Sequence, residues 1–195
     1  MSTRAIRLGV AAIALGVIAG SAAAVSATGI GGGGAARDGS SGPEGALNER
    51  LTGYEETPLA LSTPGNGRFR AMVTDAGIEY TLSYADTPTA VTQAHIHFGA
   101  TRQTGGISVF LCTNLGNGPA GTPLCPPGPA TVTGMVAPTG VVGPSAQGIA
   151  PGEYEELVRA IRAGATYVNV HTTAFGGGEI RAQIENGHEG HHDHD

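Results

Sequence analysis

The stretch GRFRAMVTDAGIEYTLSYAD, residues 67–86, contains two runs in which every second residue is apolar. The apolar residues are Phe69, Ala71 and Val73 in the first run and Ile78, Tyr80, Leu82 and Tyr84 in the second. Because successive side chains of a strand point to opposite faces, the pattern predicts two strands that each bury one face. Residues 75–77, Asp-Ala-Gly, are typical of a tight turn, so the stretch predicts an antiparallel β-hairpin.

Further strand-like runs follow in the rest of the chain, separated by turns rich in Gly, Pro and Asn. They span residues 50–55, 92–98, 107–112, 130–136, 167–171 and 179–184. About eight short strands with such turns favour an all-β fold, a Greek-key β-sandwich or barrel of antiparallel strands.

One segment has a different period. GEYEELVRAIRAG, residues 152–164, places apolar residues at helical spacing, with acidic residues in the first turn and arginines in the last. Gly164 is a natural stop signal. We expect one short amphipathic helix whose apolar face covers an opening of the sandwich.

The two ends of the chain differ from its middle. Arg4 and Arg7 precede a small, apolar stretch, and Val25-Ser26-Ala27 offers small residues at the two positions that a signal peptidase reads for cleavage after Ala27. Residues 1–27 are therefore predicted to be a signal peptide, with an uncleaved N-terminal anchor as the alternative. We expect residues 28–46 to form a Gly/Ser-rich linker, residues 47–185 a domain of ordinary size, and residues 186–195 a His-rich, disordered tail. We expect a secreted protein with no membrane association after cleavage.

The charge balance is acidic. The chain has 10 basic and 16 acidic residues, and without Arg4 and Arg7 the net charge is −8 with neutral histidines. An acidic surface without a basic stripe argues against nucleic acid and anionic membranes as partners.

Cys112 and Cys125 are the two cysteines of the chain. In an exported protein such a pair predicts a disulfide, here closing a short loop rich in Gly and Pro. A thiol pair that binds metal and two free thiols are the alternatives.

Three histidines lie inside the domain, in VTQAHIHFG (residues 91–99) and TYVNVHT (residues 166–172). If the apolar residues between them face the core, then His95, His97 and His171 all point outward. By the same alternation, Glu179 and Arg181 of the last strand point outward near His171.

Three imidazoles brought together could supply three nitrogen ligands to a Cu or Zn ion. Glu179 and Arg181 would then support or gate the site. The alternative is that the histidines bond to the backbone or to Glu179 and hold loops in place. A catalytic role would need a nucleophile, and no Ser or Cys stands in a recognisable elbow, so an enzyme is not favoured.

The tail contains four more histidines among acidic residues: His188, His191, His192 and His194. Short His-rich tracts bind Zn, Cu or Ni loosely, and a pH-sensitive polar end is the alternative.

Three stretches carry a family resemblance: LTGYEETPLALSTPGNGRF, VTQAHIHFG and YVNVHTTAFGGGEIRAQI. They resemble the chordin-type (CHRD) domain, whose pattern opens on LxGxxExPP, continues with AHIHxG and closes on YVNVHTxxxxxGEIRGQI. Thr57-Pro58-Leu59 stands where the family often has Val-Pro-Pro, and Ala182 where it often has Gly. The resemblance implies an extracellular module, found in animal regulators of growth factors and in exported microbial proteins. It implies no catalytic residues.

A weaker likeness is architectural. Copper/zinc superoxide dismutase is a Greek-key barrel with metal on its outer face, and His95, His97 and His171 resemble part of its copper set. Its other metal-binding histidines have no counterpart inside this domain, so the likeness does not predict dismutase activity.

Three functions therefore remain, in this order. The first is extracellular binding of Cu or Zn through the three histidines. The second is a non-enzymatic module that binds an extracellular protein or polymer through its acidic face. The third is a copper-dependent oxidoreductase.

Overall fold

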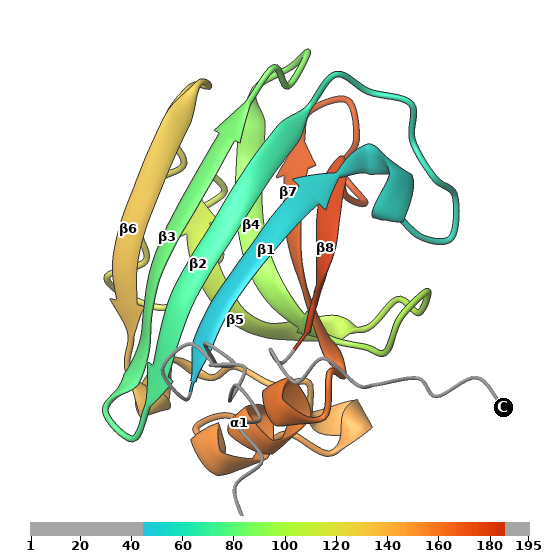
Figure 1. Cartoon of the computed structure of the whole chain (residues 1–195). Coiled ribbons are helices and arrows are strands. Elements are labelled where there is room, and N and C mark those ends of the chain that lie inside the picture. The colour runs from blue at the N-terminus through green and yellow to red at the C-terminus, as the bar shows by residue number, and fades with distance from the viewer. Residues whose placement is uncertain (1–44, 186–195) are drawn as a thin grey trace, which may run out of the picture. The chain divides into compact units, whose positions relative to one another are not determined.

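The computed structural model describes residues 45–185, which form a sheet of eight antiparallel strands curled into a nearly closed barrel (Figure 1). The strands are β1 (Ala46–Thr52), β2 (Asn66–Thr74), β3 (Gly77–Ala85), β4 (Val91–Phe98), β5 (Gly106–Thr113), β6 (Ala130–Val136), β7 (Thr166–Thr172) and β8 (Ile180–Ile184). Their order across the sheet is β5-β4-β7-β8-β1-β2-β3-β6, and the two edge strands contact each other. The prediction of an all-β fold is confirmed.

The strands on either side of the β5–β6 contact are connected in the Greek-key manner. β4, β5 and β6 follow one another around the barrel, and β3 lies hydrogen-bonded to β6 rather than to β4. The chain therefore crosses one end of the barrel between β3 and β4.

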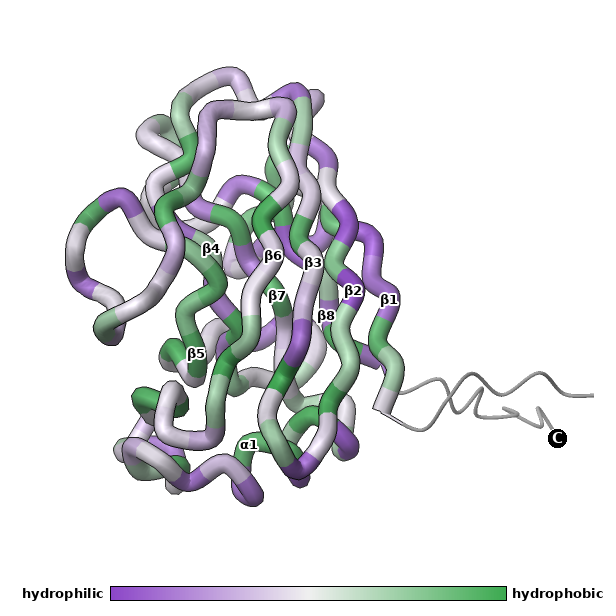
Figure 2. Tube along the Cα trace, turned by 90° about the vertical axis from the view of Figure 1, so that its left-hand side faces the viewer, coloured by the Kyte–Doolittle hydropathy of each residue, from purple (hydrophilic) through white to green (hydrophobic). Residues whose placement is uncertain are grey.

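The β2–β3 hairpin has the register that the alternating pattern demands. Phe69 pairs with Leu82, both are fully buried, and Phe69 also stacks on Tyr80 with 6.5 Å between ring centroids. Figure 2 shows the same alternation of apolar and polar residues along the strands. The turn closes at Gly77, where φ is +137° and a Cβ would lie 2.3 Å from the Val136 carbonyl oxygen.

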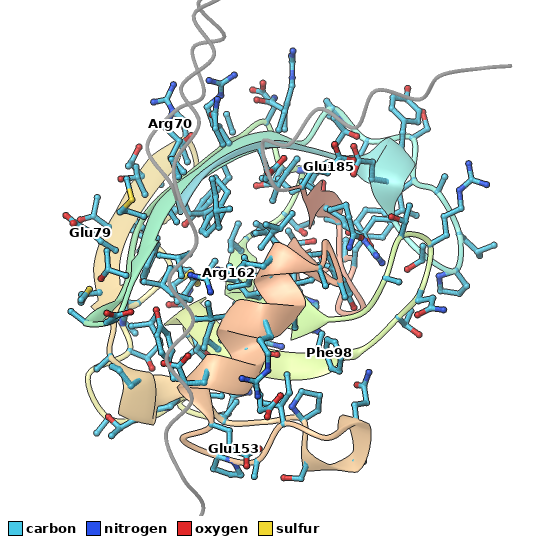
Figure 3. The ribbon with its side chains drawn as sticks, turned by 60° about the horizontal axis from the view of Figure 1, so that its bottom comes forward. Arg70, Glu79, Phe98, Glu153, Arg162 and Glu185 are labelled. Atoms are coloured by element: carbon cyan, nitrogen blue, oxygen red, sulfur yellow. A yellow bond between two sulfur atoms is a disulfide. The ribbon has the colours of Figure 1, made fainter. Side chains whose placement is uncertain are left out.

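A short helix closes one end of the barrel. α1 (Tyr154–Arg162) lies across this opening, as Figure 3 shows from below. Its buried residues are Tyr154, Leu157, Val158, Ala160 and Ile161. The Tyr154 hydroxyl also donates to the Thr74 carbonyl oxygen at 2.7 Å, which ties the helix to the hairpin. The predicted helix and its role as a cover for the core are confirmed.

One strand prediction is wrong at its end. Residues 53–55 were expected to continue the first strand, but they form a 3-10 turn, η1 (Gly53–Glu55). The Gly53 carbonyl oxygen accepts from the amides of Glu56 and Leu61, which turns the chain away from the sheet. Two further 3-10 turns, η2 (Pro138–Gly140) and η3 (Ser145–Gln147), lie between β6 and α1.

The predicted disulfide is present. Cys112 of β5 is bonded to Cys125, with 5.1 Å between their Cα atoms. Asn114 supports the loop from inside, since its amide group donates to the Cys125 carbonyl oxygen and accepts from the Cys125 amide. The bridge and these bonds hold a loop that has few apolar side chains.

The predicted signal peptide (1–27), most of the linker (28–46) and the tail (186–195) lie outside the described residues. Between residues 45 and 185, no helix combines the length and the apolar character needed to cross a bilayer.

Candidate metal centre

The sheet brings the two histidine-bearing segments together. β4 carries His95 and His97, β7 carries His171, and the two strands are hydrogen-bonded neighbours. In their register His171 pairs with Gln93 and His95 with Asn169, so His171 lies diagonally opposite His95. The sequence left this adjacency undecided, and the sheet order supplies it.

The three imidazole rings converge. Their centroids are 5.3 Å apart for His95 and His97, 5.0 Å for His95 and His171, and 5.7 Å for His97 and His171. One ring nitrogen from each residue can be chosen so that all three lie within 4.8 Å of one another. Two nitrogens bonded to one ion at about 2.0–2.1 Å are at most about 4.2 Å apart, so a small movement of the rings toward one another would bring all three nitrogens onto a single ion.

The histidines point away from the apolar core, as predicted, but they are not on the open surface. His95 is fully buried, and His97 and His171 are only 7% and 5% exposed. The Phe110 ring packs edge-on against His95 at 4.5 Å. The chain segments 99–105 and 173–178 bond to the other two rings and cover this face.

Two of the rings are oriented by backbone carbonyls. The Nδ1 atom of His97 lies 3.0 Å from the Gly105 oxygen, and Nδ1 of His171 lies 3.1 Å from the Gly176 oxygen. A carbonyl can only accept, so each Nδ1 carries the proton and each Nε2 has a free lone pair. Both Nε2 atoms, and both ring nitrogens of His95, are buried without a hydrogen-bond partner.

The surroundings keep these rings neutral. Burial, helped by the neighbouring histidines, lowers the pKa of His95 to about 2 and that of His97 to about 4, from an ordinary value of 6.5. Burial also lowers the pKa of His171. Neutral imidazole is the form that binds metals.

A stack of side chains flanks the histidines. Tyr167 of β7 lies parallel to His97, and the Arg181 guanidinium lies 3.5 Å from the centre of the same tyrosine ring. Arg181 is buried, and it donates to the hydroxyl of Thr57 and the carbonyl oxygens of Ala100 and Gln103. The arginine thus fastens the covering segments over the three histidines.

Glu179 does not take the place expected for it. Its two carboxylate oxygens accept from the hydroxyls of Thr63 and Thr172, at 2.6 and 2.7 Å, and neither bonds to a histidine. Thr172 faces the opposite side of β7 from His171, because adjacent side chains of a strand alternate. Glu179 therefore holds the loops at the barrel's end.

The acidic group near the site is instead Glu56. Asn169, between Tyr167 and His171 on the same face of β7, donates to the Glu56 carboxylate at 3.4 Å. Burial raises the pKa of Glu56 to about 7, although the Arg181 charge opposes the rise. The alternation of β7 could have indicated Tyr167 and Asn169, but Glu56 reaches the site from a loop without any periodicity.

One protein-family model matches the chain. The model of the CHRD domain matches residues 47–184. The chain belongs to the CHRD domain family. The match covers the whole barrel, including all three histidines, Tyr167, Glu56 and Arg181. A comparison with curated proteins gave no significant match, and a comparison with solved structures gave none either.

CHRD domains are extracellular modules, and the Cys112–Cys125 disulfide suits an oxidising compartment. The four tail histidines that are predicted to bind metal loosely, His188, His191, His192 and His194, lie outside the described residues.

Proposed function

We propose that this CHRD domain is a secreted metal-binding protein that holds one Cu or Zn ion through His95, His97 and His171. The observation that carries the proposal is the set of buried ring nitrogens without partners, of which His97 Nε2 and His171 Nε2 have their lone pairs free. Each of the three residues offers one of these atoms to the same small space.

The energetic cost of this arrangement supports the proposal. A buried polar atom without a partner costs about 1–3 kcal/mol, and several of them stand together here. Hydrogen bonds to the Gly105 and Gly176 carbonyls account for one nitrogen of His97 and one of His171. Loop-holding, the alternative role for the histidines, therefore explains two of their six ring nitrogens, whereas a bound ion would engage one further nitrogen of each residue.

The donor set suggests which ions fit. Imidazole nitrogens suit Zn and Cu, and three of them leave a further coordination position open. A ligating histidine usually donates its other ring N–H to a carbonyl or carboxylate, as His97 and His171 do. Binding rather than catalysis is the function proposed.

Metal stoichiometry tests the proposal. The chain from residue 28 onward is prepared with all four tail histidines replaced by Gln, offered Zn or Cu, dialysed, and analysed by elemental mass spectrometry. We expect one equivalent of retained metal. Nitrogen hyperfine couplings in the electron paramagnetic resonance spectrum of the Cu(II) form should report histidine ligation.

Three variants complete the test. His97→Gln and His171→Gln should each lower the affinity for the ion at least tenfold. Glu79→Gln, an exposed residue of β3, which borders neither β4 nor β7 in the sheet, should leave it unchanged. Circular dichroism separates loss of ligands from loss of fold. A folded protein that retains no metal would contradict the proposal, and the histidines would then be structural.

A further inference from the structure

Three arginines of the described chain lie on one outer face of the barrel, on β1 and β2. They are Arg50, Arg68 and Arg70, all exposed, and the register places Arg50 directly opposite Arg68. Figure 3 shows Arg70 pointing away from the barrel. A count of charges does not reveal this group of arginines, because it depends on which strands become neighbours.

The facing pair is unfavourable for folding. Like charges directly opposite each other on neighbouring strands destabilise a sheet. Within residues 45–185, the guanidinium groups of Arg50 and Arg68 have neither a hydrogen bond nor an ion pair, and Arg70 donates only to Asn48, at 3.4 Å. Exposed like charges that lower stability and have no partner within the protein are expected where a surface serves a function.

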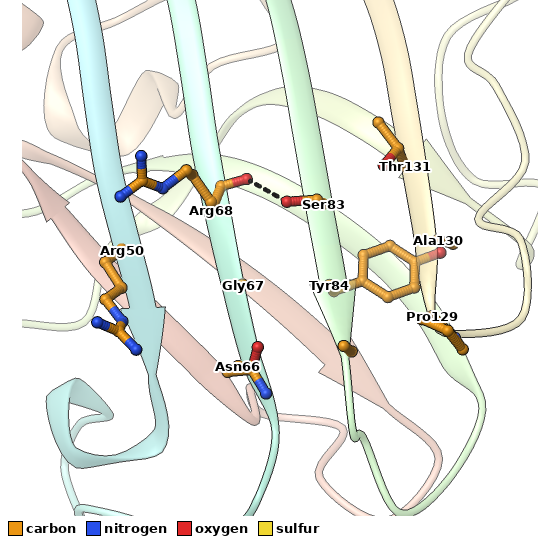
Figure 4. A pocket seen from close by; sticks show the side chains of 10 residues that line it. Arg50, Asn66, Gly67, Arg68, Ser83, Tyr84, Pro129, Ala130 and Thr131 are labelled. Carbon is orange, nitrogen blue, oxygen red and sulfur yellow. Dashed lines mark hydrogen bonds between the residues drawn. The ribbon is translucent and has the colours of Figure 1, made fainter.

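The two arginines border an open groove. It has a volume of about 640 Å³ and runs over β2, β3 and β6 (Figure 4). Polar groups along it are Asn66, Ser83 and Thr131. Its size falls in the range of about 300–1,000 Å³ that is usual for ligand sites.

We propose that this groove binds an acidic polysaccharide through its carboxylate groups. Arginine forks bind carboxylates through paired hydrogen bonds, and the serine and threonine hydroxyls can bond to sugar hydroxyls. Facing residues on neighbouring strands are about 5 Å apart, and residues two apart on one strand about 7 Å. The three charges therefore form a corner, with Arg50 across the strands from Arg68 and Arg70 farther along β2, and a chain of repeating uronic acids can contact them at several points.

The lining favours this occupant over other polyanions. The one aromatic residue lining the groove, Tyr84, has a buried ring, and its hydroxyl is bonded to the Pro126 carbonyl oxygen. It therefore offers no face on which a nucleobase could stack. The groove also has no exposed large apolar side chain that could enter a lipid layer.

Polygalacturonate is the probe. Its binding to the chain from residue 28 onward is measured by calorimetry in EDTA, so that the histidine site plays no part. Arg50→Gln/Arg68→Gln should weaken binding at least tenfold at low salt. Arg102→Gln/Arg159→Gln, which removes the same charge from other exposed positions, should change it less than twofold. Both variants should keep the wild-type circular dichroism spectrum.

Fully methyl-esterified polygalacturonate, which has the same sugars without charges, should not bind. Three results would overturn the proposal. One is no binding of polygalacturonate to the wild type. Another is equal weakening in the two double variants, which would indicate net charge alone. The third is binding of poly-L-glutamate or DNA as tight as that of polygalacturonate, which would show that the groove does not recognise a polysaccharide.

Discussion

The ring of Tyr167 stacks on that of His97, with 4.8 Å between centroids and 5° between planes. Since β7 lies between β4 and β8, the Arg181 guanidinium covers the other side of the tyrosine ring. His97 is thus packed, through the Tyr167 ring, against the buried guanidinium of Arg181. The same guanidinium bonds to the covering segments. The position of His97 and the covering of this face therefore both depend on the side chain of Tyr167.

Replacing Tyr167 should show this dependence. Tyr167→Leu is expected to lower the free energy of unfolding by about 3 kcal/mol, because it removes a desolvated cation–π contact worth about 2 kcal/mol and an aromatic stack worth about 1 kcal/mol. Tyr167→Phe keeps the ring and loses only the hydroxyl that accepts from the Gly105 amide at 3.0 Å, at a cost of about 1 kcal/mol. Urea denaturation measures both. Equal losses in the two variants would show that the ring itself contributes nothing.

Glu56 should make stability depend on pH. The pKa of its carboxyl is about 7 in the folded protein and near 4.5 when exposed in the unfolded chain. Between these values the unfolded chain releases the proton first, so this group destabilises the fold as the pH rises from 4.5 to 7. The full cost above pH 7 is on the order of 3 kcal/mol. Glu56→Gln cannot ionise, and it should be more stable than the wild type at pH 8 but not at pH 4.

The comparison between variant and wild type isolates Glu56 from the histidines. The lowered pKa values of His95 and His97 act in the opposite direction, since the unfolded chain gains protons below pH 6.5 and stability falls on acidification. This contribution is common to both proteins. Unfolding curves recorded in EDTA from pH 4 to pH 8 should therefore diverge with rising pH, and parallel curves would refute the role of Glu56.

The disulfide should contribute measurably to stability. The bridge between Cys112 and Cys125 spans a sequence separation of 13 residues. Closing a loop of this length reduces the entropy of the unfolded chain by an amount worth about 3 kcal/mol. Cys112→Ala/Cys125→Ala should lose about this much, as should the wild type in a strong reductant. The reductant should have no effect on the double variant, which serves as the control.

The period of two residues was enough to locate most strands and to assign their faces. It placed Phe69 and Leu82 in the core and directed His95, His97 and His171 to the opposite face. The period of α1 likewise predicted which of its residues are buried. These inferences succeeded because alternation and helical spacing are local properties, set by a few consecutive residues.

Which strands lie next to each other was decided by the tertiary structure alone. Whether β4 lies next to β7, or Arg50 opposite Arg68, depends on the order and register of strands far apart in the sequence. The burial of the histidines depends on covering segments that have no periodic pattern. The sequence therefore determined which side chains share a face, whereas the closed barrel and its loops decided which of them meet and which are removed from water.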